Sequence, residues 1–402
     1  MKKILIFSLS YYPQFTSGAE AAIKEITDRI KPDDYEFHMV TNRYDSKIEK
    51  VEKIGNVLVH RIGITKKNPT FEDLGRLPLD INKPLYQFLA AWKALWLHRK
   101  YKYDGIWSMM AHSAGVPAAI FKIFNPKVSY ILTLQEGDSP EYIEKTMKPL
   151  WPLFKRAFTS ADIIQSISTF LSEWARKRNF EGPIELIHNG ANPRDVAAVF
   201  DEQEIENLRK ELGKKEGDIF LVNTARLVYQ KATNITIQAL KLLPENIKFI
   251  IVGGGDEVDM LKTLTKELDL EHRVVFVGKV DRSVVTNYRK AADIFVCPSR
   301  SEGLGNAFLS AMASKLPVIA TQAGGIKEFL FDKKHNPDKT ETGWVVDVDS
   351  PEQIAQAVKD ILANPEKVAR ITNNAREMVL RKFNWDMVAK DMQEKVFNRV
   401  IK

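Results

Sequence analysis

Short apolar runs alternate with longer amphipathic segments along the amino-terminal half of this 402-residue chain. The runs are rich in Ile, Val and Phe, which is typical of buried strands, and they cover residues 3–8, 36–41, 57–62, 105–109, 128–134, 163–166 and 184–187. Segments with helical periodicity cover residues 19–30, 85–100, 114–123, 150–160 and 169–178. Strands that alternate with helices in this way predict a parallel sheet covered on both faces.

The carboxyl-terminal half repeats this alternation. Its predicted strands are residues 219–224, 248–252, 274–277, 294–296, 318–320 and 343–346. Its predicted helices are residues 234–243, 256–268, 284–291, 306–314, 351–363, 365–382 and 386–402. A turn-rich segment at 188–193, followed by a polar helix from Asp201, indicates a domain boundary near residue 194. The sequence therefore predicts an α/β protein with two doubly wound parallel-sheet domains, 1–193 and 194–382.

Composition narrows the class of protein. Apolar residues make up 44% of the chain and charged residues 28%, as in soluble globular proteins. A single cysteine allows no internal disulfide, so we expect a cytoplasmic protein. No leader-like segment or long apolar run stands out. The net charge of +7 is a weak sign of an anionic partner: a diphosphate, an anionic lipid surface or a nucleic acid would satisfy it, and dispersed surface lysines are the commonest explanation. We expect no nucleic-acid partner.

The sequence offers little for metal or thiol chemistry. The seven histidines show no zinc-ligand spacing, and no acidic triplet stands out, so we expect metal-independent chemistry without a cofactor. Cys297 is the single cysteine, which excludes an internal disulfide. It lies in an apolar strand end without a basic neighbour, so we expect a buried small hydrophobe rather than a catalytic thiol.

One segment, residues 299–328, combines a strand end, a glycine-containing turn, a helix and a second strand end. Open parallel sheets bind ligands at the carboxyl ends of their strands. Gly303 and Gly305 allow the backbone to approach a ligand closely, and the helix that begins at Asn306 directs its free N–H groups toward the loop. The segment therefore predicts an anion site, suited to a diphosphate.

This segment resembles the signature of the retaining GT-B glycosyltransferases of family 4, and the resemblance extends along most of the chain. In that family two glutamates, separated by seven residues, contact the donor sugar and the nucleotide ribose. Glu302 matches the first, whereas Ser310 stands in the place of the second and offers one hydroxyl instead of a carboxylate. The alternative for Glu302 is a solvated loop carboxylate. The donor-binding residues implied in this loop are Glu302, Gly303, Leu304, Gly305, Asn306 and Ser310.

The loop after the strand at 219–224 resembles a second family motif, whose arginine and lysine bind the donor diphosphate. Arg226 and Lys231 match these cations, while Ala225 and Ala232 replace the usual glycines. Cleavage of a sugar–phosphate bond develops negative charge on the leaving diphosphate, and without a metal fixed cations must stabilise it. The alternative is a pair of solvated surface cations.

Two further loops resemble nucleotide-binding segments of the family. The triple glycine that begins at Gly253 either lies close to the nucleotide or forms a tight helix entry with Asp256 as N-cap. In the loop after the strand at 274–277, Lys279, Val280 and Arg282 are expected around the base.

The resemblance also assigns residues in the first domain. Gly18 corresponds to a backbone contact to the donor phosphates, although an ordinary helix N-terminus explains it as well. Gln135 and Glu136 stand where the family commonly has a histidine near the reaction centre, and Glu136 is a candidate proton acceptor. His112 is an alternative, with a satisfied loop histidine as its simpler explanation. A last segment, 383–402, introduced by Phe383 and Trp385, crosses back to the first domain in this family.

Leu85, Phe88, Leu89, Trp92, Leu95 and Trp96 form an apolar stripe on one helix that ends in basic residues. We expect this stripe to face the core, with contact to an anionic membrane as the alternative.

The resemblance implies two Rossmann-like domains that face each other across a cleft. It also implies transfer of a hexosyl unit, with retention, from a UDP- or GDP-sugar to a hydroxyl of a saccharide or lipid-linked acceptor. The alternatives are a GT-B sugar-nucleotide epimerase or phosphorylase, and a scaffold that binds nucleotide sugars with little turnover.

Overall fold

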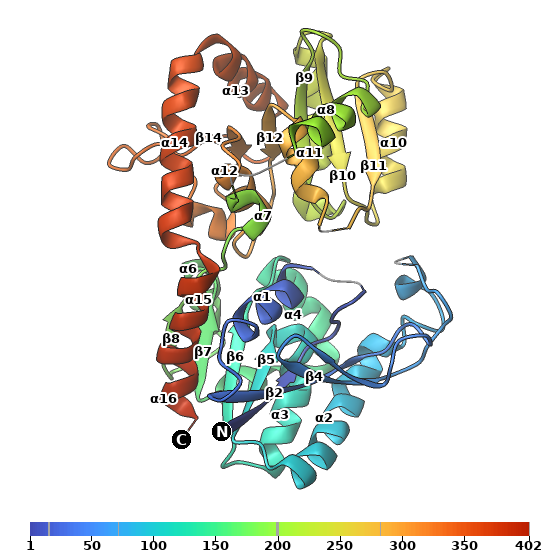
Figure 1. Ribbon diagram of the computed structural model, residues 1–402, viewed down its shortest axis with the longest axis vertical. Coiled ribbons are helices and arrows are strands. Elements are labelled where there is room, and N and C mark those ends of the chain that lie inside the picture. Colours follow the sequence, from blue (N-terminus) through green and yellow to red (C-terminus); the bar gives the residue numbers. More distant parts are fainter. Residues whose placement is uncertain (15–16, 71, 198–200, 282, 402) are drawn as a thin grey trace. The chain divides into compact units, whose positions relative to one another are not determined.

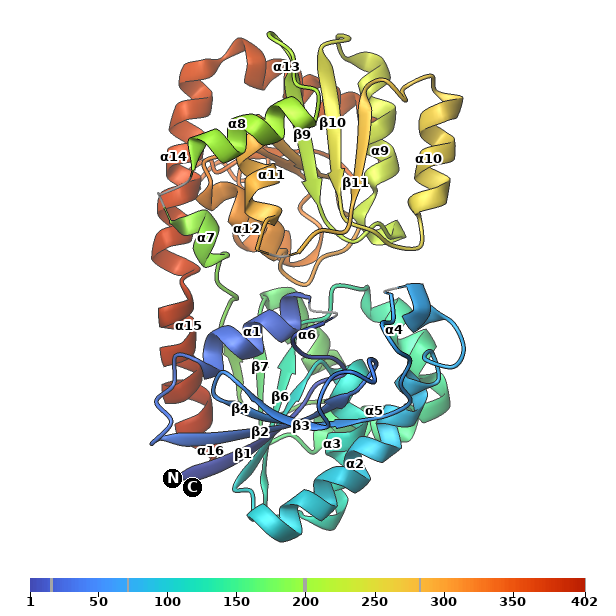
Figure 2. The same ribbon diagram turned by 45° about the vertical axis from the view of Figure 1, so that its right-hand side comes forward.

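The computed structural model describes residues 1–14, 17–70, 72–197, 201–281 and 283–401. The chain forms two compact units (Figure 1). The first unit comprises Met1–Asn189 and Trp385–Lys402, and the second comprises Gly190–Asn384. Each unit has a central sheet with helices on both faces, as Figures 1 and 2 show. The predicted fold class, two doubly wound parallel-sheet domains, is confirmed.

The sheet of the first unit has the strand order β3-β4-β2-β1-β5-β6-β7-β8. Its strands are β1 (Lys2–Phe7), β2 (Tyr35–Asn42), β3 (Val51–Ile54), β4 (Val57–Ile62), β5 (Gly105–Met109), β6 (Ser129–Leu134), β7 (Ile163–Ser166) and β8 (Ile184–Leu186). All pair in parallel except β3, which is antiparallel to β4 at the edge. The pattern of β3 alternates between exposed and half-buried residues and has no apolar run, which explains why the sequence did not predict this strand.

The helices of the first unit are α1 (Gly18–Thr27), α2 (Asn82–Tyr101), α3 (Val116–Phe124), α4 (Pro140–Met147), α5 (Trp151–Thr159) and α6 (Thr169–Lys177). A π-helical turn, Ala111–Gly115, precedes α3. The sequence did not predict α4, whose N-terminus is capped by the Ser139 hydroxyl. The expectation for α2 was wrong in one respect. Its large apolar side chains face outward, while Tyr86, Ala90, Ala94 and Leu97 are buried.

The final segment of the chain belongs to the first unit and consists of α15 (Trp385–Asp391), η7 (Met392–Phe397) and α16 (Asn398–Val400). Met392 and Phe397 are fully buried in the core that also contains Phe37 and Trp107. The Phe397 ring lies 5.3 Å from the Trp107 ring and 6.0 Å from the Phe37 ring, measured between centroids. A segment from the far end of the sequence therefore completes this hydrophobic core.

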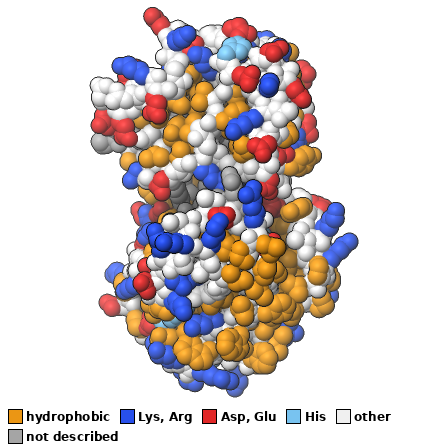
Figure 3. All heavy atoms as spheres, turned by 90° about the vertical axis from the view of Figure 1, so that its right-hand side faces the viewer, with side chains coloured by type: hydrophobic (Ala, Val, Ile, Leu, Met, Phe, Trp, Pro, Cys, Tyr) orange, Lys and Arg blue, Asp and Glu red, His pale blue; other side chains and the backbone are white. Residues whose placement is uncertain are grey.

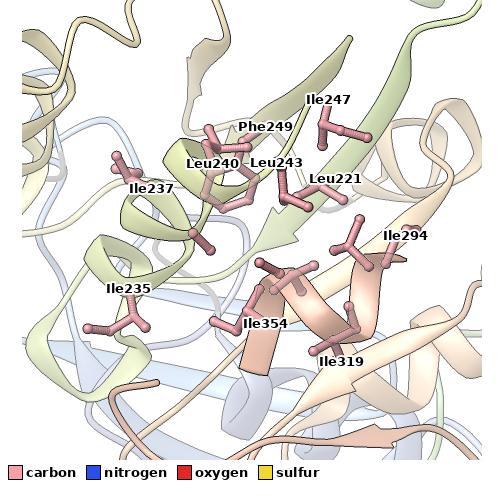
Figure 4. Close-up of a cluster of buried hydrophobic side chains, with 14 of the residues drawn as sticks. Leu221, Ile235, Ile237, Leu240, Leu243, Ile247, Phe249, Ile294, Ile319 and Ile354 are labelled. Atoms are coloured by element: carbon pink, nitrogen blue, oxygen red, sulfur yellow. The ribbon is translucent and has the colours of Figure 1, made fainter. Parts of the chain in front are cut away.

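The second unit has a six-stranded sheet, all parallel, with the strand order β11-β10-β9-β12-β13-β14. The strands are β9 (Ile219–Thr224), β10 (Ile247–Val252), β11 (Val274–Gly278), β12 (Ile294–Cys297), β13 (Val318–Ala320) and β14 (Trp344–Val345). Figure 4 shows part of the core on one face, where Leu221, Phe249, Ile294 and Ile319 of the strands meet side chains of the neighbouring helices. Because both faces are covered, the strands are continuous apolar runs in the sequence.

The helices of the second unit are α7 (Pro193–Val196), α8 (Glu202–Glu211), α9 (Thr233–Ala239), α10 (Val258–Glu267), α11 (Val285–Ala291), α12 (Asn306–Ala313), α13 (Pro351–Ala363) and α14 (Pro365–Lys382). A buried ion pair ties α7 to the rest of this unit. The Arg289 guanidinium donates to both carboxylate oxygens of Asp195, at 2.9 and 2.5 Å, and the Ser314 hydroxyl donates to the same carboxylate at 3.0 Å.

The burial of Phe397 leads to a stability prediction. Phe397→Ala removes a fully buried ring and leaves a cavity, so we expect the free energy of unfolding of the first unit to fall by about 3–5 kcal/mol. Phe88→Ala, at a position that is 51% exposed, is the matched control and should change it by less than about 1 kcal/mol. Urea unfolding, followed by tryptophan fluorescence and circular dichroism, measures both. Equal stability of the two variants would contradict a core role for the final segment.

Candidate functional site

The strand order of the second unit reverses between β9 and β12. β9 is the first strand of this unit, and β10 and β12 flank it on opposite sides. The connections therefore leave β9 and β12 toward opposite faces of the sheet, and open parallel sheets bind ligands where the order reverses. Lys231 lies in a short 3₁₀ turn, Tyr229–Lys231, after β9, and Glu302 lies in the loop after β12.

Lys231 and Glu302 meet at this point as a buried ion pair. The Lys231 ammonium is hydrogen-bonded to the Glu302 carboxylate. The Ser299 hydroxyl donates to the same carboxylate oxygen at 3.1 Å. The exposed fractions of Lys231 and Glu302 are 9% and 6%, so neither group is a solvated surface charge. Sequence reasoning had placed the two residues in one site without predicting this contact.

Neighbouring loops hold the Glu302 loop in place. The Gly325 N–H donates to the Glu302 carbonyl at 2.9 Å, and the Thr321 hydroxyl donates to the Ser299 carbonyl at 2.5 Å. A Cβ atom at Gly324 would lie 2.1 Å from the Glu302 carbonyl oxygen. Glycine is needed at this position because the two backbones touch. Ser299 and Thr321 were missed as site residues, although Ser299 lies only three residues before Glu302.

The triple glycine that begins at Gly253, after β10, allows a similar close contact between two backbones on the other side of β9. The Leu227 N–H donates to the Gly254 carbonyl at 3.0 Å, and a Cβ atom at Gly253 would lie 1.9 Å from the Ala225 carbonyl oxygen. These glycines therefore position the loop that carries Arg226, whose side chain is exposed. Of the two alternatives for this segment, the one with Asp256 as N-cap of the next helix was wrong, because α10 begins at Val258 with Glu257 at the N-cap.

The remaining donor-loop residues lie directly before α12. Gly303 and Leu304 are buried, and Gly305 has a φ of +99°, a conformation that favours glycine. α12 then begins at Asn306, where the sequence predicted it. Val280 is half-buried in the loop after β11, and Arg282 lies outside the described residues.

Ser310 is buried in the middle of α12, and its hydroxyl accepts a hydrogen bond from the Asn192 N–H at 3.2 Å. The Asn192 side chain caps α7 by accepting from the Arg194 N–H at 3.0 Å. The position that carries a carboxylate in the family therefore contacts the segment before α7 in this chain. Asn192 was not predicted as a site residue.

In the first unit, Glu136 is buried and holds the backbone of two loops. One carboxylate oxygen accepts from the Ala111 N–H at 2.5 Å, and the other accepts from the Gln135 N–H at 2.9 Å. His112 Nδ1 lies 3.6 Å from the first of these oxygens. The Gln135 and Asn189 side-chain amides bond to each other in both directions, at 3.2 and 3.1 Å.

Gly18 is exposed and is the first residue of α1. The Glu20 carboxylate occupies this helix end, because it accepts hydrogen bonds from both the backbone N–H and the hydroxyl of Ser17, at 2.7 and 2.6 Å. The Ser10 hydroxyl donates to its other oxygen at 2.7 Å. An ordinary capped helix start thus accounts for part of the pattern around Gly18.

The structure also bears on thiol reactivity, metal binding and membrane-spanning helices. Cys297 is buried, and desolvation raises the pKa of its thiol to about 11, which disfavours a reactive thiolate. Within the described ranges, His, Cys, Asp and Glu side chains form no group of three that could hold a metal ion. Among the helices in the described part of the chain, none combines the length and apolar character needed to cross a bilayer.

Comparisons with known proteins agree with this geometry. Residues 204–378 match the family described as Glycosyl transferases group 1, and residues 16–195 match Glycosyltransferase Family 4. An uncharacterized glycosyltransferase of Methanocaldococcus jannaschii is 27% identical over 402 residues, which covers 97% of this chain and 96% of that protein.

Two further proteins carry information about donors. A GDP-mannose-dependent alpha-(1-6)-phosphatidylinositol monomannoside mannosyltransferase of Mycolicibacterium smegmatis is 29% identical over 246 residues, 58% of this chain and 61% of that protein. The Anabaena protein HepE, solved in complex with UDP-glucose, superposes with a TM-score of 0.76 at 20% identity, covering 99% of this chain and 100% of HepE.

The two doubly wound units, together with these matches, define a GT-B protein. The chain belongs to glycosyltransferase family 4, the glycosyl transferases group 1. It is a glycosyltransferase, so the predicted class of activity is confirmed over the epimerase, phosphorylase and scaffold alternatives.

Proposed function

We propose that this protein transfers a hexosyl unit, with retention and without a metal ion, from a nucleotide-diphosphate sugar to an acceptor hydroxyl. The acceptor would be a saccharide or a lipid-linked saccharide. The observation that carries the proposal is the buried Lys231–Glu302 pair at the switch point of the second unit. It joins a cation suited to a diphosphate with a carboxylate suited to sugar hydroxyls.

The cations would stabilise the leaving diphosphate. Negative charge develops on the diphosphate as the sugar–phosphate bond breaks. Preorganised hydrogen-bond donors lower the barrier because they need no rearrangement. The Lys231 ammonium has three N–H donors, so it can retain Glu302 and still bind a phosphate oxygen. Arg226, exposed in the same loop after β9, would supply a second cation. The N-terminus of α12, at Asn306, would direct backbone N–H groups at the same phosphates.

The remaining residues would position the donor and the acceptor. Glu302 would orient the donor sugar, with Gly303, Leu304 and Gly305 shaping the loop. In the first unit, Gly18 would supply a backbone contact to the donor phosphates, and Gln135 would act near the reaction centre. Glu136 fits a positioning role better than proton transfer, because both of its oxygens already accept from backbone N–H groups.

The base pocket would include Gly253 and Val280, with Arg282 as a further candidate from the sequence. The base itself stays open between uridine and guanosine. HepE was solved with UDP-glucose, and the mycobacterial relative is named as GDP-mannose-dependent. A binding screen of UDP- and GDP-sugars, followed by linkage analysis of the product, identifies the donor and the acceptor.

The diphosphate assignment predicts the effect of removing each cation. Arg226→Ala and Lys231→Ala should each lower kcat/KM, and each loss should correspond to about 2–4 kcal/mol of transition-state stabilisation. The matched control is Lys262→Ala, at an exposed position on α10 outside the site, and it should leave kcat/KM unchanged. The thermal midpoint of Arg226→Ala must be measured, so that a loss of activity is separated from a loss of folding. The thermal midpoint must be measured for Lys231→Ala, because that change leaves Glu302 buried without its partner. Activity of Arg226→Ala within about twofold of wild type, under 0.5 kcal/mol, would refute the assignment.

Metal independence predicts that chelation leaves turnover unchanged. Protein treated with EDTA, then dialysed and assayed in metal-free buffer, should retain its full rate, because fixed cations take the place of a divalent ion. The measurement is the initial rate with and without added Mg²⁺ or Mn²⁺. A rate that collapses after EDTA and returns with either ion would contradict this part of the proposal.

Substitution of Ser310 by glutamate is predicted to change the affinity for the nucleoside diphosphate. We propose that it is a weakened ribose contact, so Ser310→Glu should tighten binding of the nucleoside diphosphate by about 1–3 kcal/mol through charge-assisted hydrogen bonds. A carboxylate there can also accept from the Asn192 N–H. Ser310→Ala is the control and should bind no more tightly than wild type. Isothermal titration at constant salt measures the three dissociation constants. Unchanged or weaker binding by Ser310→Glu would show that the ribose is held elsewhere.

A further inference from the structure

Helix α2 presents its large apolar side chains to the outside. Leu85, Phe88, Leu89, Trp92 and Trp96 recur at the spacing of one helix face. The exposed fractions of Phe88, Trp92 and Trp96 are 51%, 72% and 53%. The opposite face, which packs in the unit, is formed mainly by smaller side chains and by Tyr86 and Leu97. Burial of the larger face would have removed more apolar surface from water, so folding of this unit does not explain the stripe.

The exposed apolar surface extends beyond α2. Before the helix, Leu77 is 74% exposed and Ile81 37% exposed. At the end of α3, which packs against α2, Phe124 is 66% exposed. Figure 3 shows hydrophobic side chains gathered on this face of the first unit, with Lys and Arg side chains at its margins. Single exposed apolar residues are ordinary, whereas a gathered patch with two exposed tryptophans marks an interaction surface.

The charged side chains of α2 have one sign. The segment from Ile81 to Tyr103 contains no Asp or Glu, and its cations are Lys83, Lys93, Arg99, Lys100 and Lys102. The Lys93 ammonium lies 4.4 Å from the centroid of the Trp96 ring, beside the apolar stripe. Tryptophan and lysine in such an arrangement suit the interface of a bilayer, where the ring enters the headgroup region and the ammonium reaches the phosphates.

We propose that the outer face of α2 docks the first unit onto a membrane surface that contains anionic phospholipids. The apolar stripe would enter the headgroup region with the helix parallel to the surface, and the cations would contact lipid phosphates. A second copy of the chain fits less well, because an isologous contact through this face would bring the same cations together. This proposal does not depend on the transfer reaction and is tested without measuring it.

The test is cosedimentation of the full chain with vesicles of phosphatidylcholine, with and without phosphatidylglycerol. We expect the wild type to bind the anionic vesicles and to bind them less as NaCl is raised. Trp92→Ser with Trp96→Ser should lower the partition coefficient by roughly tenfold or more. The matched control, Leu242→Ser with Met260→Ser, removes two exposed apolar side chains of the second unit and should bind like wild type.

Three outcomes would overturn the proposal. The wild type could stay in the supernatant with anionic vesicles at low salt, or the double tryptophan variant could bind as well as the wild type. Sedimentation velocity without lipid could instead show a dimer that the tryptophan variant abolishes, which would assign the face to a second copy. The thermal midpoint of the variant, and retained binding by Trp92→Phe with Trp96→Phe, separate loss of docking from loss of folding.

Discussion

Parallel strand pairing is the constraint on which the site in the second unit depends. Each parallel pair needs a crossover, so every strand of the six-stranded sheet ends at the same edge. Because β9 is central and the chain later returns to its other side, the loops after β9 and β12 lie at the switch point, where open parallel sheets bind ligands. Lys231 and Glu302 lie in these two loops, and the glycine loops after β10 and β13 pack against them.

The buried ion pair has a physical cost that points to its use. Removal of two charges from water is expensive, and such pairs often contribute little or nothing to stability. Here the pair lies beside the N-terminus of α12, among loops whose backbones touch through glycines. Charged groups held in place before the substrate arrives are what an enzyme needs to stabilise a leaving diphosphate.

Helix α2 is a second place where the arrangement of side chains does not serve folding alone. An amphipathic helix in a soluble domain buries its larger apolar face, whereas α2 exposes Trp92 and Trp96 and buries alanines. Places where a chain departs from the arrangement that best serves folding are commonly functional. The charge of the segment, which has cations and no carboxylates, is consistent with the anionic surface that we propose for it.

Local hydrophobic patterning was enough to predict most of the elements, because strands buried on both faces are continuous apolar runs. β5, β7, β9 and β13 begin and end where the pattern predicted. The edge strand β3 was missed since it is solvated and has no such run. Motif resemblance placed Lys231 and Glu302 in one site, but their direct contact, like that of Ser310 with Asn192 118 positions away, arises only when distant segments meet.

The orientation of α2 was also decided by tertiary structure. Periodicity shows that a helix has an apolar stripe, yet α2 has apolar residues on both faces. The face with the smaller side chains is the one that packs against α3 and the sheet. The physical reason is general. Local sequence sets which conformations a segment favours, whereas the partners of a side chain depend on segments far away in the chain.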